Sequence, residues 1–169
     1  MAAAGNSTSG NNAWRVLVAG VSTVSGEPGK LLDRLRAENP GVYLQGADAQ
    51  AVYGVDHAIG VVHIAFEAHQ RKVMMAARLE IEVLLRLACT DQISDALKKA
   101  GLKAGRPGCF IAFSKDAGAV SRLGEQLGKL DDSVLLPSRE KAARMSAALG
   151  FNKMTLNYLL ERAAILVKG

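Results

Sequence analysis

One predicted helix, spanning Met74 to Ala88, constrains the fold more than any other segment, because apolar side chains lie on almost all of its sides. Its apolar residues keep helical spacing on two faces, with Ile81, Leu84, Leu85 and Ala88 on one and Leu79, Val83 and Leu87 on the other. Its charged residues Arg78, Glu82 and Arg86 recur at every fourth position and form one stripe. A helix that is apolar outside a single stripe is expected at the centre of a fold.

The segments around this helix predict a single α+β domain over residues 13–169. Further helices are expected at 29–38, 56–71, 90–101, 117–130, 138–149 and 153–167, and strands at 13–21, 42–45, 109–113 and 134–136. The strands lie far apart in the sequence, so a central helical cluster should pack on a small mixed or antiparallel sheet. Residues 1–12, rich in Ala, Gly, Ser and Asn, are expected to be a disordered segment.

Composition limits the class of protein. Hydrophobic residues make up 49% and charged residues 22% of the 169 positions, which is typical of a globular chain. No apolar run approaches the roughly 20 residues that span a bilayer, and two isolated cysteines suit a reducing compartment. We therefore expect a cytoplasmic protein, also nuclear if eukaryotic, without membrane contact. The net charge of +5 favours polyanions such as RNA only weakly, because many proteins without such partners share it.

No arrangement of residues predicts catalysis, a metal or a cofactor. The segment 26–30 has the setting of a phosphate loop, but Val24 and Leu31 stand where that loop needs glycine and Ser or Thr, so a turn is favoured. His57, His63 and His69 are six residues apart on one predicted helix and point in three directions, so they cannot share a metal. The sequence thus predicts a protein that is not an enzyme.

Two groups of residues leave alternatives open. A catalytic role for Cys89 is compatible with the sequence, although a small buried residue is the favoured interpretation. Basic residues cluster at 71–72, at 98–99 and at 139–144, where Arg139, Lys141 and Arg144 share one helix. Each cluster is most simply a solvated face, and few aromatic residues accompany them. From the residues alone, the chain is an interaction domain, with RNA as one partner class.

Residues 77–113 carry a more specific pattern. Residues 80–85 form a glutamate-bearing apolar run, 90–92 a short polar joint, 93–101 the pattern Ile-Ser-x-Ala-Leu-x-Lys-x-Gly, and 109–113 an apolar strand. This pattern resembles the PRPK-binding protein family, the small kinase-binding subunit of the KEOPS (EKC) complex. Residues 47–71 and the final helix are similar to that family more loosely.

The resemblance implies a non-catalytic subunit of the complex that makes threonylcarbamoyladenosine in tRNA. Such a subunit binds the PRPK-like kinase, and through it lies indirectly next to the catalytic threonylcarbamoyl-transfer subunit. In archaeal relatives it also holds the single-stranded 3′ CCA tail of tRNA. A stand-alone RNA-binding protein, outside any kinase-containing assembly, is the alternative.

The resemblance also implies site residues. The tRNA-binding residues are expected to be Arg71, Lys72, Arg78, Gln92 and Ile93. The archaeal joint has a basic residue where this chain has Asp91, and a carboxylate near a phosphate costs affinity. An alternative role for Ile93 is inward packing, as the first apolar residue of its helix.

For the kinase, an exposed apolar patch on the last helix is expected. The residues predicted to form it are Leu156, Tyr158, Leu159 and Arg162.

Overall fold

A small antiparallel sheet organises the computed structural model, which describes residues 4–5 and 13–167. Its strands are β1 (Ala4–Gly5), β2 (Arg15–Val21), β3 (Tyr43–Asp48) and β4 (Gly108–Ser114). The strand order is β1-β2-β4-β3, so β4 lies between β2 and β3 and pairs antiparallel with both. Of the predicted disordered segment 1–12, only the two residues of β1 are described; the rest lies outside the described residues, and disorder there remains a prediction.

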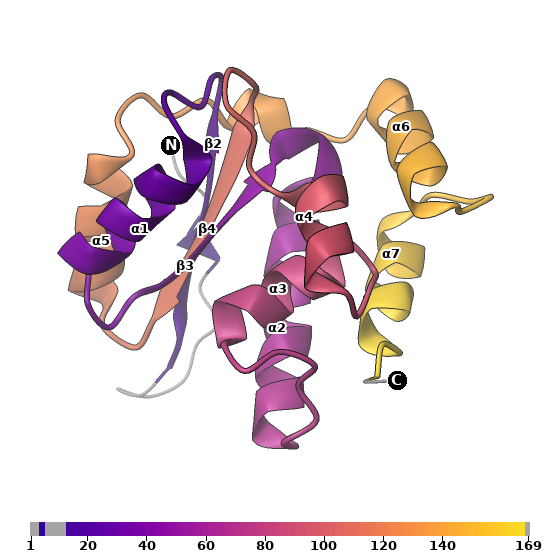
Figure 1. Ribbon diagram of the computed structural model, residues 1–169, viewed down its shortest axis with the longest axis horizontal. Helices are drawn as coiled ribbons and strands as arrows, with labels where there is room; N and C mark the ends of the chain where they lie inside the picture. The colour runs from indigo at the N-terminus through magenta and orange to yellow at the C-terminus, as the bar shows by residue number, and fades with distance from the viewer. Residues whose placement is uncertain (1–3, 6–12, 168–169) are drawn as a thin grey trace.

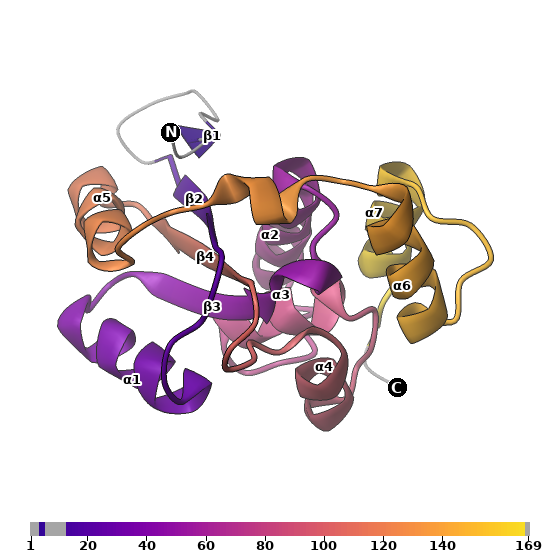
Figure 2. The same ribbon diagram turned by 90° about the horizontal axis from the view of Figure 1, so that it is seen from above.

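Helices cover both faces of the sheet (Figure 1). They are α1 (Pro28–Glu38), α2 (Val55–Gln70), α3 (Leu79–Leu87), α4 (Ile93–Ala100), α5 (Ala117–Gln126), α6 (Arg139–Leu149) and α7 (Leu156–Ala164), with short 3-10 helices η1 (Ala49–Ala51) and η2 (Asp132–Leu135). Figure 2 shows α1 and α5 on one side, and α2 and α3 on the other, with α4, α6 and α7 beyond them. This arrangement confirms the predicted α+β domain with a helical cluster on an antiparallel sheet.

Alternating side chains of the strands supply two cores. In β2, Val18 packs with α2 and α3, whereas Ala19 faces α1 and α5. In β4, Ile111 and Phe110 divide in the same way. Successive side chains of a strand point to opposite faces, and here both faces are covered. The strands β2 and β4 therefore appear in the sequence as continuous apolar runs instead of alternating ones.

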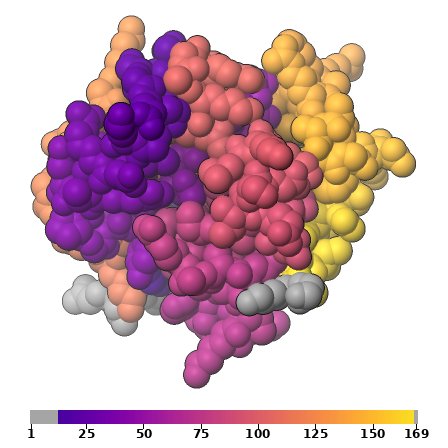
Figure 3. Space-filling view, in the orientation of Figure 1, coloured from indigo at the N-terminus to yellow at the C-terminus, as the bar shows by residue number. Residues whose placement is uncertain are grey.

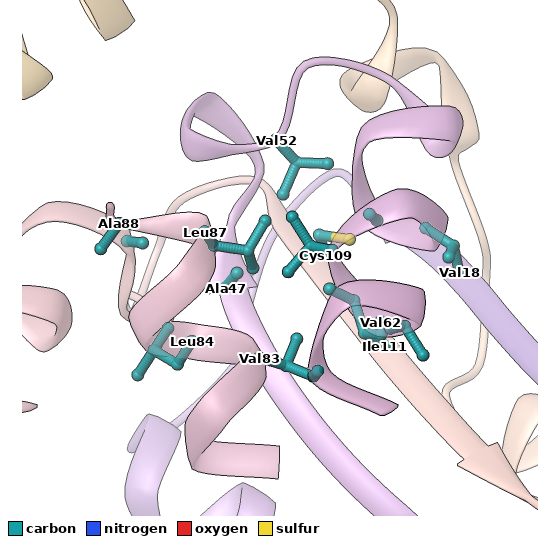
Figure 4. Close-up of a cluster of buried hydrophobic side chains, with 14 of the residues drawn as sticks. Val18, Ala47, Val52, Val62, Val83, Leu84, Leu87, Ala88, Cys109 and Ile111 are labelled. Atoms are coloured by element: carbon teal, nitrogen blue, oxygen red, sulfur yellow. The ribbon is translucent and has the colours of Figure 1, made fainter. Parts of the chain in front are cut away.

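Helix α3 lies in the larger core, as its apolar faces predicted (Figure 4). It begins at Leu79, five residues later than predicted, because the chain before it is held by a side chain. The carboxylate of Glu82 accepts hydrogen bonds from the backbone N–H groups of Met75 (2.8 Å) and Ala76 (2.9 Å). The predicted charged stripe is divided in the structure, because Glu82 and Arg86 are buried whereas Arg78 is exposed.

Two further predictions were wrong around residue 134. The expected strand 134–136 is the 3-10 helix η2, which is held at the end of β2 because Gly20 N–H donates to Asp132 Oδ1. Lys141, expected on a solvated face, is 3% exposed. Its ammonium group donates to the carbonyl oxygens of Val52 (3.1 Å) and Val134 (2.8 Å), so it links α6 to both 3-10 segments.

Candidate functional site

The predicted tRNA-binding residues fall into two groups. Arg71, Lys72 and Arg78 surround the connection between α2 and α3, near the bottom of Figure 1. All three are exposed, and Arg78 lines an open hollow of about 500 Å³ that it shares with Arg36 and His69. Arg71 is paired with Glu67 (2.7 Å) and Arg78 with Glu80. This group is basic but largely neutralised by its own acidic neighbours.

The second group lies at the other end of α3. Gln92 precedes α4 and Ile93 begins it, whereas Arg78 precedes α3. The nine residues of α3 separate the two groups by about 13 Å along the helix axis. The structure therefore does not bring all five residues into one contact site.

The start of α4 is an exposed apolar surface. Ile93 is 50% exposed, so the alternative that it simply packs inward is wrong. Leu97, one turn later, is 54% exposed, while the small residues Ala96 and Ala100 face the core. Gln92 is the N-terminal cap of α4 and makes no side-chain hydrogen bond to the helix. The alanines at 96 and 100 are the sequence signal that could have identified Leu97 as exposed, because small residues mark the face of α4 that packs on the core.

The predicted kinase-binding residues of α7 differ in how far they are buried. Leu159 is fully buried and anchors the helix to the core. Leu156 is half-buried and lines a hollow beside Leu136. Tyr158 packs edge-on against Phe151, at 5.2 Å between ring centroids. Of these three residues, only Leu156 and Tyr158 offer part of their side chains to a partner.

Arg162, the fourth of these residues, lies where α7 approaches the end of α3. Its guanidinium lies 5.4 Å from the ring centre of Phe151, and its Nε is buried without a hydrogen-bond partner among the described residues. Arg162 and Lys99 both act on the Cys89 thiol, which places α7, α4 and the end of α3 around one point. The last turn of α4, which carries Lys99, and the predicted kinase helix therefore lie near the same thiol.

The cysteines are not set up as nucleophiles. Burial raises the pKa of Cys89 to about 11, against the opposing effect of Arg162 and Lys99. Burial likewise raises the pKa of Cys109 to about 12. Thiols are reactive as thiolates, and both groups are protonated at neutral pH. Within residues 4–5 and 13–167, no three His, Cys, Asp or Glu side chains come together as a metal site.

The comparison with protein families decides the relationship. Residues 23–146 match the model of kinase binding protein CGI-121. The chain belongs to the CGI-121 family. A search of curated proteins finds no match for the chain.

The matched range includes the α2–α3 connection and the start of α4, but it ends before α7. Proteins of the CGI-121 family are kinase-binding adaptors, generally without catalytic activity. In the part of the chain that the structure describes, every helix is too short or too polar to cross a membrane.

Proposed function

We propose that this chain is the non-catalytic subunit of a KEOPS complex that binds the PRPK-like kinase and helps to recruit tRNA through its 3′ CCA tail. The match to the CGI-121 family over residues 23–146 carries the proposal. The proposed domain that binds the kinase spans residues 13–169. The catalytic threonylcarbamoyl-transfer subunit is then an indirect partner, reached through the kinase.

An apolar surface around α7 supports the proposed place of kinase contact. Leu136 is 64% exposed next to Leu156 at the start of α7, and Ile165 is 62% exposed just after its end. Exposed apolar groups that follow one helix are typical of a surface that binds another protein. Leu156, Tyr158 and Arg162 lie between these two residues along the chain, and Leu159 holds the helix in place.

A variant at the end of α7 tests the kinase contact. Ile165→Asp should weaken binding of the PRPK-like kinase at least tenfold, because a carboxylate buried in an apolar interface loses its hydration without a partner. Val73→Asp, 53% exposed at the α2–α3 connection, is the matched control and should bind like the unchanged chain. Binding is measured by co-purification and by titration with the kinase from the same organism, where roughly equal amounts of the two proteins are expected.

Failure of the unchanged chain to bind that kinase would contradict the proposed function. Binding to tRNA that persists in that case would instead support a stand-alone RNA-binding protein. Equal binding of the kinase by the unchanged chain, Ile165→Asp and Val73→Asp would support a kinase-binding protein but show that the contact does not involve the end of α7.

The start of α4 supports the proposed contact with tRNA. Ile93 offers an apolar side chain to an unstacked base, and the first N–H groups of α4 are available to a phosphate. Asp91 is exposed and hydrogen-bonded to Gln92 (3.2 Å), so its carboxylate opposes a phosphate at this place. The positive charges of Arg71, Lys72 and Arg78 lie at the other end of α3, so they act on a phosphate at the start of α4 only from that distance.

Removal of the carboxylate at position 91 should therefore strengthen binding. We expect Asp91→Asn to raise the affinity for intact tRNA several-fold at low salt, and to have little effect on tRNA that lacks its CCA tail. Asp33→Asn, on the exposed side of α1, is the control. Filter binding at a fixed salt concentration measures both ligands. Equal binding of intact and shortened tRNA by the unchanged chain would contradict tail recognition.

A further inference from the structure

A hollow between α4 and α6 has no part in the surfaces described above. It has a volume of about 160 Å³ and opens between the loop that follows α4 and the outer helix α6 (Figure 3). Its floor is apolar and comes from η1, the end of α3, α4 and α6: Ala51, Leu87, Ala88, Ala100, Met145 and Leu149. The hollow lies at the end of α4 opposite Ile93, about 12 Å away along eight residues.

Cations surround the mouth of this hollow. Lys99, Lys103, Arg106 and Arg144 line it, and Asp48 is the only carboxylate among its lining residues. Asp48 is buried, accepts a hydrogen bond from Gln50 N–H (2.9 Å), and lies 3.3 Å from the nearest nitrogens of both Lys103 and Arg106. The buried carboxylate of Asp48 thus pairs with two cations. The four cations and this one carboxylate give the lining residues a formal net charge of +3.

Two of the cations are free to turn toward a ligand at little cost. Lys99 is paired with Asp95 and Arg144 with Glu140, each four residues away on its own helix. Both acidic partners are at least one-third exposed, and neither lines the hollow. Exposed pairs at this spacing on one helix contribute little to stability. An anion in the mouth can therefore replace these partners.

We propose that this hollow binds a small organic phosphate of the nucleoside monophosphate class. A cavity of about 150 Å³ is known to hold a benzene ring, so the apolar floor of this hollow fits one ring of the base, and the rest of the ligand lies in its open mouth. A phosphate monoester carries about −1.5 to −2 charges at pH 7, which offsets most of the excess positive charge, whereas a carboxylate offsets only one unit. Arginine also matches phosphate with two parallel hydrogen bonds. Inorganic phosphate alone would leave the apolar floor unused.

The ligand class is tested by titration calorimetry on the full chain at a fixed salt concentration, with AMP, adenosine and inorganic phosphate as probes. AMP should bind at one site per chain, and adenosine and phosphate should each bind at least tenfold more weakly. Affinity for AMP should fall as salt increases. Absence of AMP binding, or equal affinities for AMP and inorganic phosphate, would overturn the proposal.

Two variants place the ligand in the hollow. Arg144→Gln should weaken AMP binding at least fivefold, while Arg139→Gln removes the same charge from the same helix outside the hollow and should change nothing. Ala148→Trp should abolish binding, because the indole fills the hollow without altering the net charge. AMP binding that is unchanged in both Arg144→Gln and Ala148→Trp overturns the assignment of the ligand to this hollow. The proposal is also overturned if the unchanged chain binds an RNA oligonucleotide but not AMP, and both variants weaken that binding. The test does not depend on kinase binding.

Discussion

Glu82→Ala is expected to lower the free energy of unfolding by about 3–5 kcal/mol, because it leaves a buried arginine without its counter-ion. Glu82 is fully buried and Arg86 is 2% exposed. One carboxylate oxygen of Glu82 accepts hydrogen bonds from Arg86 Nε (2.9 Å) and lies 2.6 Å from its second nitrogen. The other oxygen accepts the N–H groups of Met75 and Ala76, so the same substitution also frees the chain before α3.

A matched control exists on α2. Glu67 and Arg71 have the same four-residue spacing, but their side chains are 57% and 71% exposed. Glu67→Ala should cost less than 1 kcal/mol, as exposed pairs usually do. Urea denaturation of both variants gives the comparison. Equal losses would show that burial of the Glu82–Arg86 pair does not matter to stability.

The same pair ties the proposed kinase helix to the core. Arg86 donates to the carbonyl oxygen of Ala163 at 2.6 Å, near the end of α7. We therefore expect the loss in Glu82→Ala to include loosening of α7, visible as faster hydrogen exchange there than in α1. Exchange that rises equally in both helices would indicate global unfolding instead.

Much of the fold was predictable from the sequence because it depends on local patterns. The strands β2 and β4 are continuous apolar runs, and α3 has apolar residues around most of its surface. The predicted helix 90–101 ends at its glycine, because Gly101 follows α4 with an extended backbone, at a φ of −64°. Glycine is required there because a Cβ would lie 2.4 Å from the carbonyl oxygen of Leu97.

What failed depends on partners distant in sequence. Every-fourth spacing of Glu82 and Arg86 is equally compatible with an exposed stripe and a buried pair, and the decision rests on Ala163, 77 residues beyond Arg86. The burial of Lys141 was unpredictable for the same reason, because its carbonyl partner Val52 is 89 residues away. The arrangement of the candidate site also depends on contacts between distant residues. The basic residues were identifiable, but α3 separates them, and that separation follows from packing.

Acidification should destabilise the protein through His57. This side chain is fully buried in α2; its Nδ1 accepts a hydrogen bond from Tyr53 N–H (3.0 Å), and its Nε2 has no partner among the described residues. Burial, with the nearby positive charge of Lys141, lowers the pKa of His57 from 6.5 to about 4. Protonation in the folded state would place a second positive charge beside Lys141.

The direction follows from which state binds the proton. Between pH 6.5 and about 4, the unfolded chain protonates His57 and the folded chain does not, so the free energy of unfolding falls as pH falls. The stability that neutral His57 contributes is fully present above pH 6.5, and the loss reaches about 3 kcal/mol by pH 4. His57→Asn keeps an acceptor near Tyr53 N–H and should remove most of this pH dependence, whereas His63→Asn, exposed on the same helix, should retain it. Denaturant titrations from pH 7 to pH 4 measure the three slopes, and a slope unchanged in His57→Asn would assign the acid sensitivity to other groups.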